Sequence, residues 1–274
     1  MFLSPGEEPH SRRQSVQLNH AGASPSPQRV LDRVYEHLKL EQDDGGYAAQ
    51  NAVQQSGELE KVYSDVARLI HATTEGSKAN ANEIALVESA TVGWTRAFYA
   101  LVQRDEQERK TSFQENDKLP STNTRVILIS EAEYAANVVA ACQWAKDHDD
   151  HWMVLGIPSS QSENGSTGIV DLNVLESMLE GKFCYKDKSG EDLLLDPTSI
   201  ALVCITHVPT NSGIVNPVEE IGERISNYNQ RRQQQETKES YLNSIKYLVD
   251  ACQSVGQMDV NVQKIHCDAL VATG

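Results

Sequence analysis

The sequence predicts an α/β protein: a three-layer αβα arrangement around a mainly parallel sheet. From residue 83 onward, short apolar segments typical of strands alternate with helical segments, many of ten or more residues. Connections of that length between strands are crossovers, which make neighbouring strands parallel and cover both faces of the sheet. A chain of 274 residues with 39% hydrophobic residues is long enough to bury such a core.

The N-terminal part precedes this alternation. Residues 1–17 form a polar tail without the apolar run of a signal peptide, and residues 18–27 are expected to be irregular because they contain Gly22, Pro25 and Pro27. Two helices should follow. The first carries four apolar residues on one face, and the second runs from about residue 47 to 71. The four apolar residues are Val30, Leu31, Val34 and Leu38.

The remaining elements alternate in type. Strands are expected at 83–87, 125–129, 152–157, 200–206, 245–249 and 268–272, and helices at 91–102, 135–148, 172–179 and 217–228. Two polar stretches interrupt them. Residues 103–124 are charged and predict a surface loop. Residues 227–244, rich in Gln and Arg, predict a solvated helix extension or a disordered insertion, and we favour the insertion.

The charge limits the partners. A net charge of -15 argues against binding to nucleic acid or to an anionic membrane, and no stretch approaches the roughly 20 apolar residues of a membrane span. The five cysteines form no CxxC pair and predict buried thiols of a reducing compartment. We therefore expect a cytoplasmic protein, with organellar import left open by the arginine and serine residues near the start. No metal site is expected.

Polar residues follow the predicted strands, where open parallel sheets bind ligands. Ala90 and Thr91 open a helix, so this junction is either a helix cap or an anion site. Asp250 closes an apolar strand, where a carboxylate needs a cationic partner or serves as a helix N-cap. No G-x-G-x-x-G motif, P-loop or H-E-x-x-H motif is present.

Three segments together carry a family resemblance: Thr-His-Val-Pro-Thr-Asn-Ser-Gly at 206–213, Tyr-Leu-Val-Asp-Ala-Cys-Gln-Ser at 247–254, and Cys-Asp-Ala-Leu-Val-Ala-Thr-Gly at 267–274. They resemble the cofactor-binding core of the class V aminotransferases, pyridoxal-phosphate-dependent enzymes of fold type I that include cysteine desulfurases. The resemblance covers most of residues 18–274. It implies pyridoxal 5'-phosphate as cofactor, a small-molecule amino acid as substrate, and a homodimer when the protein is full length.

The resemblance also assigns site residues. It implies that Ala90, Thr91 and Thr273 contact the cofactor phosphate, and that Thr210, Asn211 and Gln253 lie near its phenolic oxygen. Two residues are implied to be catalytic. Asp250 would pair with the pyridinium nitrogen, and Tyr134 stands where desulfurase-like relatives carry a histidine stacked on the ring. Asp268 matches a structural aspartate.

In this family the run Ala-Thr-Gly is followed within two residues by the lysine that holds the cofactor as a Schiff base. The sequence ends at that Gly, so we expect residues 18–274 to be a partial large domain, incomplete at its C-terminus, without the small domain, and inactive alone. The parent enzyme would be a carbon-sulfur lyase or desulfurase, a transaminase or an epimerase. The alternative is a catalytically dead homologue that acts as a binding or interaction module or has no stable function.

Overall fold

The computed structural model describes residues 16–18, 24–74, 78–112, 124–148, 151–187, 189–234 and 244–273. The chain divides into two compact units, Met1–Val53 and Gln54–Gly274, which are described separately. In the first unit, α2 (Gln28–Asp44) confirms the first predicted helix. It follows Pro27 and ends at Gly45, whose φ of 86° lies in the left-handed region. Most of the polar tail predicted at residues 1–17 lies outside the described residues.

The single helix expected at 47–71 is in fact two helices, α3 (Gly46–Ser56) and α4 (Glu58–Leu69). The break is at Gly57, whose φ of 70° is left-handed and cannot continue a right-handed helix. In α4, Glu58 and Glu60 in the first turn and Arg68 in the last turn have the signs that the helix dipole favours. The periodic pattern therefore predicted the helical content but not the break.

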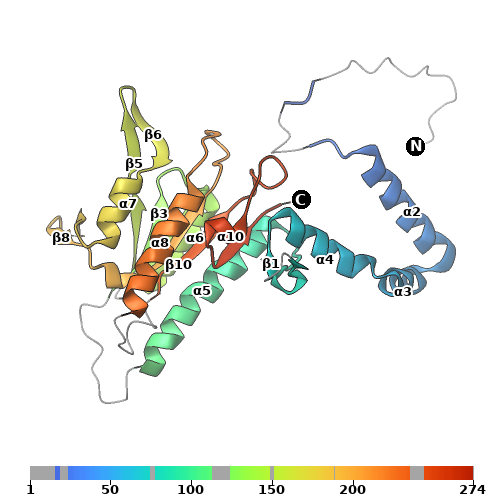
Figure 1. The fold of residues 1–274 in the computed structure, drawn as a ribbon, viewed down its shortest axis with the longest axis horizontal. Helices are drawn as coiled ribbons and strands as arrows, with labels where there is room; N and C mark the ends of the chain where they lie inside the picture. The colour runs from blue at the N-terminus through green and yellow to red at the C-terminus, as the bar shows by residue number, and fades with distance from the viewer. Residues whose placement is uncertain are drawn as a thin grey trace. The chain divides into compact units, whose positions relative to one another are not determined.

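The second unit is built on a five-stranded sheet in the order β11-β10-β9-β3-β4, in which every neighbouring pair is parallel (Figure 1). Its strands are β3 (Arg125–Ser130), β4 (Trp152–Ile157), β9 (Ile200–Thr206), β10 (Lys246–Asp250) and β11 (Ala269–Val271). All seven residues of β9, the central strand, are buried. The predicted parallel α/β sheet is confirmed.

Helices cover both faces of this sheet. They are α5 (Ala90–Ser112), α6 (Ala135–Asp147), α7 (Leu172–Leu179), α8 (Val218–Gln233) and the short α10 (Val262–Ile265). Trp94 and Phe98 of α5 and Trp144 of α6 pack with one side of the strands. Leu175 of α7 and Ile221 of α8 pack with the other side. This is the expected three-layer αβα arrangement.

Three small antiparallel pairs lie outside the main sheet and were not predicted. They are β1 (Thr73–Thr74) with β2 (Lys78–Ala79), β5 (Ser159–Ser162) with β6 (Gly165–Val170), and β7 (Cys184–Lys186) with β8 (Asp192–Leu194). These strands are short, and most of their residues are polar. They lack the apolar alternation by which strands are recognised in a sequence.

The strand predicted at 83–87 is not formed. Residues 81–83 are a 3-10 turn, η1 (Ala81–Glu83), and residues 84–87 are in neither helix nor strand. An apolar run becomes a strand only where another strand pairs with it, and no described strand pairs with this one. The prediction of a strand at residues 83–87 is therefore wrong for the described chain.

Helices continue into both of the polar stretches that were expected to interrupt the fold, residues 103–124 and 227–244. Helix α5 continues through residues 103–112, where the exposed ion pairs Arg104–Glu108 and Lys110–Glu106 have helical i,i+4 spacing. Helix α8 continues to Gln233, so residues 227–233 are a helix extension and not the insertion that we favoured. The remaining residues of these two stretches, 113–123 and 235–243, lie outside the described residues.

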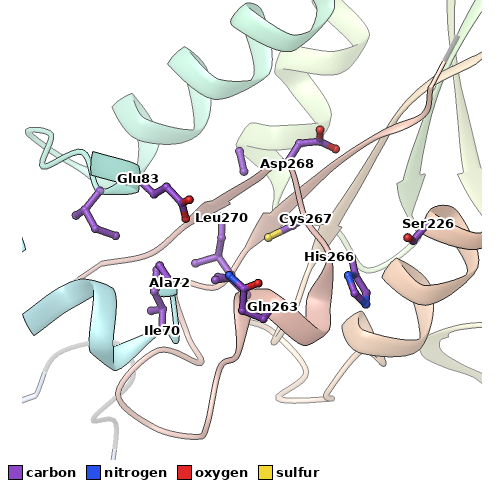
Figure 2. Close-up of a pocket in the computed structure, with 12 residues that line it drawn as sticks. Ile70, Ala72, Glu83, Ser226, Gln263, His266, Cys267, Asp268 and Leu270 are labelled. Atoms are coloured by element: carbon purple, nitrogen blue, oxygen red, sulfur yellow. The ribbon is translucent and has the colours of Figure 1, made fainter. Parts of the chain in front are cut away.

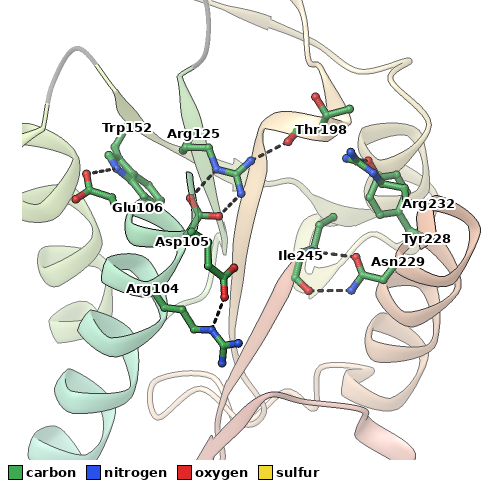
Figure 3. Close-up of polar contacts among 11 residues, drawn as sticks. Arg104, Asp105, Glu106, Arg125, Trp152, Thr198, Tyr228, Asn229, Arg232 and Ile245 are labelled. Carbon is green, nitrogen blue, oxygen red and sulfur yellow. Dashed lines mark hydrogen bonds and ion pairs between the residues drawn. The ribbon is translucent and has the colours of Figure 1, made fainter. Parts of the chain in front are cut away.

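A buried ion pair fixes α5 to the amino end of β3 (Figure 3). Arg125 donates to both carboxylate oxygens of Asp105, and its third hydrogen bond goes to the carbonyl oxygen of Thr198, 2.7 Å away. On the same helix, Glu106 accepts from the indole nitrogen of Trp152 at 3.2 Å. These contacts lie at the end of the sheet opposite to the carboxyl ends of its strands.

The cysteines correct another prediction. Only Cys204 is buried, whereas Cys142 and Cys184 are exposed and Cys252 and Cys267 are intermediate. Within the described part of the chain, no helix is both long enough and apolar enough to cross a bilayer.

Candidate functional site

The predicted site residues lie at the carboxyl edge of the sheet because four parallel strands, β3, β9, β10 and β11, end there. Backbone hydrogen bonds join the segments that leave these strands. The N–H of His207 donates to the carbonyl of Asp250 at 2.8 Å, and the N–H of Ala251 donates to the carbonyl of Val271 at 2.7 Å. The chain after β9, β10 and β11 is thus held together, as expected of a ligand-binding edge.

Asp250 ends β10 and is 7% exposed. Its Oδ2 accepts a hydrogen bond from the side-chain amide of Asn137 at 3.0 Å, and its Oδ1 accepts from the N–H of Cys252 at 3.1 Å. The second bond closes a local turn, and because residues 252–254 are a turn and not a helix, the helix N-cap role that the sequence left open is not observed. Both donors are neutral, and no described lysine, arginine or histidine forms an ion pair with Asp250. A buried carboxylate thus remains without a cation.

Tyr134 follows β3 and is the residue before α6. Its backbone N–H donates to Thr206 Oγ1 at 3.3 Å, which ties the exit of β3 to the last residue of β9. Its side chain makes no capping bond to the helix, and the residue is 45% exposed. An aromatic ring with an accessible surface therefore belongs to the same edge of the sheet as Asp250.

The start of α5 packs against the end of β11. A Cβ added to Gly93, in the first turn, would lie 3.2 Å from Val87 Cγ2 and 3.4 Å from Val271 Cγ1. The absence of a side chain therefore allows this close approach. The N–H groups of Ala90 and Thr91 belong to the first turn, where a helix offers no acceptors of its own, and Thr273 follows two residues after β11. The structure brings these three residues to one end of the sheet.

Thr210 and Asn211 lie in an exposed turn after β9, closed by a hydrogen bond of 3.0 Å from the Gly213 N–H to the Pro209 carbonyl. Gln253 lies in the turn after β10 and is partly buried. No hydrogen bond joins any of these three residues to Tyr134 or to the Asp250 carboxylate. The structure therefore places them on the segments that leave β9 and β10, without linking them to Tyr134 or to the Asp250 carboxylate.

Two further polar residues at this edge were not found from the sequence, Glu133 and Asn137. The Glu133 carboxylate accepts from Ser130 Oγ at 2.9 Å, from the Thr206 N–H at 2.8 Å, from Asn137 Nδ2 at 2.9 Å, and also from the Thr206 hydroxyl. Burial raises the pKa of Glu133, although these hydrogen bonds act in the opposite direction. One feature of the sequence could have revealed Glu133: two carboxylates, Glu131 and Glu133, come directly after the strand that ends at Ser130.

Burial favours the neutral forms of two titratable side chains beside Asp250, Cys252 and His207. Burial, together with the negative charge of Asp250, raises the pKa of Cys252, so its thiol is not a thiolate near neutral pH. Burial lowers the pKa of His207, whose Nδ1 lies 3.0 Å from Ser254 Oγ. Among the described residues, no group of three or more His, Cys, Asp or Glu could hold a metal ion.

A cavity of about 600 Å³ lies elsewhere, beside β11 and away from these residues (Figure 2). Its lining includes Ile70, Glu83, Gln263, His266 and Leu270, and none of the predicted site residues. Burial raises the pKa of Cys267, which also lines it, to about 12. This cavity contains no thiolate at neutral pH and is not part of the candidate site.

The comparison with protein-family models bears on the last third of the chain. Residues 185–274 match the sequence model of the family described as aminotransferase class-V. This segment is similar to the class V aminotransferase family. The match contains Asp250 and the three segments on which the resemblance rested, so the resemblance is confirmed there. The comparison with curated proteins gave no significant match.

Two solved structures have the same fold. The apo structure of cysteine desulfurase from Thermococcus onnurineus NA1 is 19% identical, with a TM-score of 0.58 over 93% of this chain and 48% of that one. A structure described as SspA in complex with cysteine is 17% identical, with a TM-score of 0.56 over 93% of this chain and 56% of that one. These two likenesses show that the chain has the fold of the large domain of fold type I enzymes. The chain spans about half of the length of each of the two proteins.

Proposed function

We propose that the carboxyl edge of the sheet binds pyridoxal 5'-phosphate and that the protein acts on a small-molecule amino acid. The observation that carries the proposal is Asp250, a carboxylate 7% exposed whose described partners are neutral donors. An ionised carboxylate in such a place is costly unless a cation joins it. A protonated pyridine nitrogen is a cation of the right size, and it would compensate this charge.

The other residues at the edge fit the remaining parts of the cofactor. The first turn of α5 offers the free N–H groups of Ala90 and Thr91 and a positive dipole end to the phosphate, with Thr273 nearby. The partly exposed Tyr134 offers a flat aromatic face for the ring. Thr210, Asn211 and Gln253 would serve the phenolic oxygen from the turns after β9 and β10.

Asp250 would act by holding a proton on the ring nitrogen. When bound, the cofactor supplies an electron sink for bond cleavage at the substrate α-carbon, and this sink depends on the ring carrying that proton. Of the chain's own groups, Tyr134 provides no imidazole that titrates near neutral pH, and burial disfavours the charged form of His207. The proposal therefore assigns binding and orienting roles to the residues at this edge.

The class V family and the desulfurase fold support a carbon-sulfur lyase or desulfurase, a transaminase or an epimerase as the reaction type. We include a homodimeric, cytoplasmic enzyme in the proposal, as the family resemblance implies. Cys252, whose pKa is raised, is unsuited to the nucleophilic role that a desulfurase requires.

Binding of pyridoxal 5'-phosphate to the purified chain tests the proposal. Asp250→Asn should weaken binding about tenfold or more, because it removes a charge-assisted hydrogen bond from a buried site. Asp171→Asn is the matched control, because asparagine caps the start of α7 as well as Asp171 does. Equal affinity of the Asp250 variant and the wild type, measured by equilibrium dialysis, would exclude the assigned role. Absence of binding by the wild type would remove the proposal.

A further inference from the structure

One amide nitrogen connects two carboxylates at this edge. Asn137 Nδ2 donates to Asp250 Oδ2 at 3.0 Å and to Glu133 Oε1 at 2.9 Å. A side-chain amide has two hydrogens on this nitrogen, so each carboxylate can take one. Asn137 is 3% exposed, which means that water cannot easily replace either bond. The position of Asp250 Oδ2 is thus tied to helix α6.

Glu133 is itself a fixed anchor. Its carboxylate accepts from Ser130 Oγ and from both the N–H and the hydroxyl of Thr206, in addition to Asn137. These bonds attach it to the last residues of β3 and β9. A group held by four donors has little freedom to move. The amide of Asn137 therefore connects Asp250 to a rigid part of the sheet.

An amide at position 137 affects Asp250 differently from a cationic side chain. A lysine or arginine in the place of Asn137 would also orient Asp250, but it would neutralise the charge. An amide orients the carboxylate without bringing a compensating positive charge. The described neighbourhood thus fixes Asp250 and still leaves its charge for a ligand.

We propose that Asn137 is a positioning residue, which uses Glu133 as its anchor and holds the Asp250 carboxylate in place for a protonated ring nitrogen. The inference rests on the proposed function, since the ring is that of pyridoxal 5'-phosphate. It predicts that Asn137 contributes to the recognition of the ring nitrogen and not to the recognition of the phosphate or of the flat ring.

Two probes separate these contributions: 4-deoxypyridoxine 5'-phosphate and its 1-deaza analogue, in which C–H replaces the ring nitrogen. Neither has an aldehyde, so neither can form a covalent bond to a lysine. Calorimetric titration of the wild type should give an affinity for the nitrogen-containing probe that is about tenfold or more above that of the analogue, as expected for a charge-assisted hydrogen bond.

The decisive variant is Asn137→Ser, whose hydroxyl ends one bond short of the asparagine nitrogen and cannot keep both contacts. It should lose most of the preference for the nitrogen-containing probe and keep the affinity for the deaza analogue. Gln143→Ala is the matched control, because Gln143 is an amide on the same helix that donates to a carboxylate, Asp147, on the exposed surface. It should keep the wild-type preference.

The outcomes distinguish the two proposals. A wild type without any preference would contradict the proposed role of Asp250, and the inference would fall with it. A wild-type preference that survives in Asn137→Ser would overturn the inference alone. If Asn137→Ser does not fold by circular dichroism, Glu133→Gln takes its place and should reduce the preference. A full preference in Glu133→Gln would overturn the anchoring role.

A double variant gives a further check. In the Asp250→Asn background, Asn137→Ser should cause no additional loss of preference, because the group that it positions has been removed. An additional loss equal to that in the wild-type background would show that Asn137 acts independently of Asp250, and this result would also overturn the inference.

Discussion

Gly222 of helix α8 lies directly against the backbone carbonyl of Ile265 in α10. A Cβ added to Gly222 would come 1.7 Å from that oxygen and 2.8 Å from its carbon. The two helices can approach so closely only because position 222 has no side chain. Backbone atoms cannot rotate away as a flexible side chain can, so any larger residue must displace α10 or α8.

We therefore expect Gly222→Ala to lower the free energy of unfolding by about 3 kcal/mol or more, at the upper end of the cost of overpacking. Gly156→Ala is the control within the same unit, because no atom lies within 4 Å of the added Cβ and the change should stay within about 0.5 kcal/mol. Urea unfolding followed by circular dichroism measures both. Equal midpoints for the two variants would contradict the close contact.

The buried pair Arg125–Asp105 leads to a second prediction. Asp105→Ala would leave the guanidinium of Arg125, 1% exposed, without its carboxylate, and we expect a loss of about 3 to 5 kcal/mol. Arg104→Ala, one residue away on the same helix, breaks only the exposed pair with Glu108 and should leave the unfolding midpoint unchanged. A similar midpoint for the two variants, measured in urea, would count against the burial of the pair.

Glu133 leads to a prediction about pH. Burial raises its pKa in the folded protein above the value in the unfolded chain, so the folded state binds the proton more tightly. Its stabilising contribution is complete below the unfolded pKa and is lost as the pH rises through the raised folded pKa. The stability of the wild type relative to Glu133→Gln should therefore fall as the pH rises across that interval. Unfolding at a series of pH values measures this difference, and a difference that grows with pH would contradict it.

Gly93 leads to a prediction about the phosphate. In Gly93→Val the new side chain would meet Val87 and Val271 and move the first turn of α5 away from β11. If that turn binds the phosphate, the affinity for pyridoxal 5'-phosphate should fall several-fold while the weaker affinity for pyridoxal stays unchanged. Thr95→Val, on the same helix and with no added volume, is the control. A parallel fall for both ligands would indicate general damage to the site.

The sequence predicted the sheet well where the strands are long apolar runs. The strands at 152–157 and 200–206 and the helix at 172–179 have the predicted bounds, because long apolar runs and their spacing report burial directly. It failed at residues 83–87, which are just as apolar, because strand formation also needs a partner. The hairpin of β5 and β6 was missed for the opposite reason, since it is polar but paired.

In the candidate site, too, the sequence revealed what depends on local pattern and missed what depends on distant partners. Asp250 could be chosen from the sequence because a carboxylate closing an apolar strand is an anomaly that local pattern reveals. Glu133 and Asn137 were missed, because their importance comes from partners that are distant in sequence. Thr206 lies 73 residues after Glu133, and Asp250 lies 113 residues after Asn137. Only the parallel order of β3, β9 and β10 brings them together.

This sequence separation also determines when the site can assemble in the cell. At a synthesis rate of about 5 to 20 residues per second, roughly 6 to 23 s pass between the appearance of Asn137 and that of Asp250. During the first part of that interval β3, β4 and α6 can already pack together, but Glu133 and Asn137 have neither Thr206 nor Asp250 to bind. The carboxyl end of β3 must stay hydrated until β9 and β10 arrive, so on the ribosome the binding edge cannot close before most of the chain has been made.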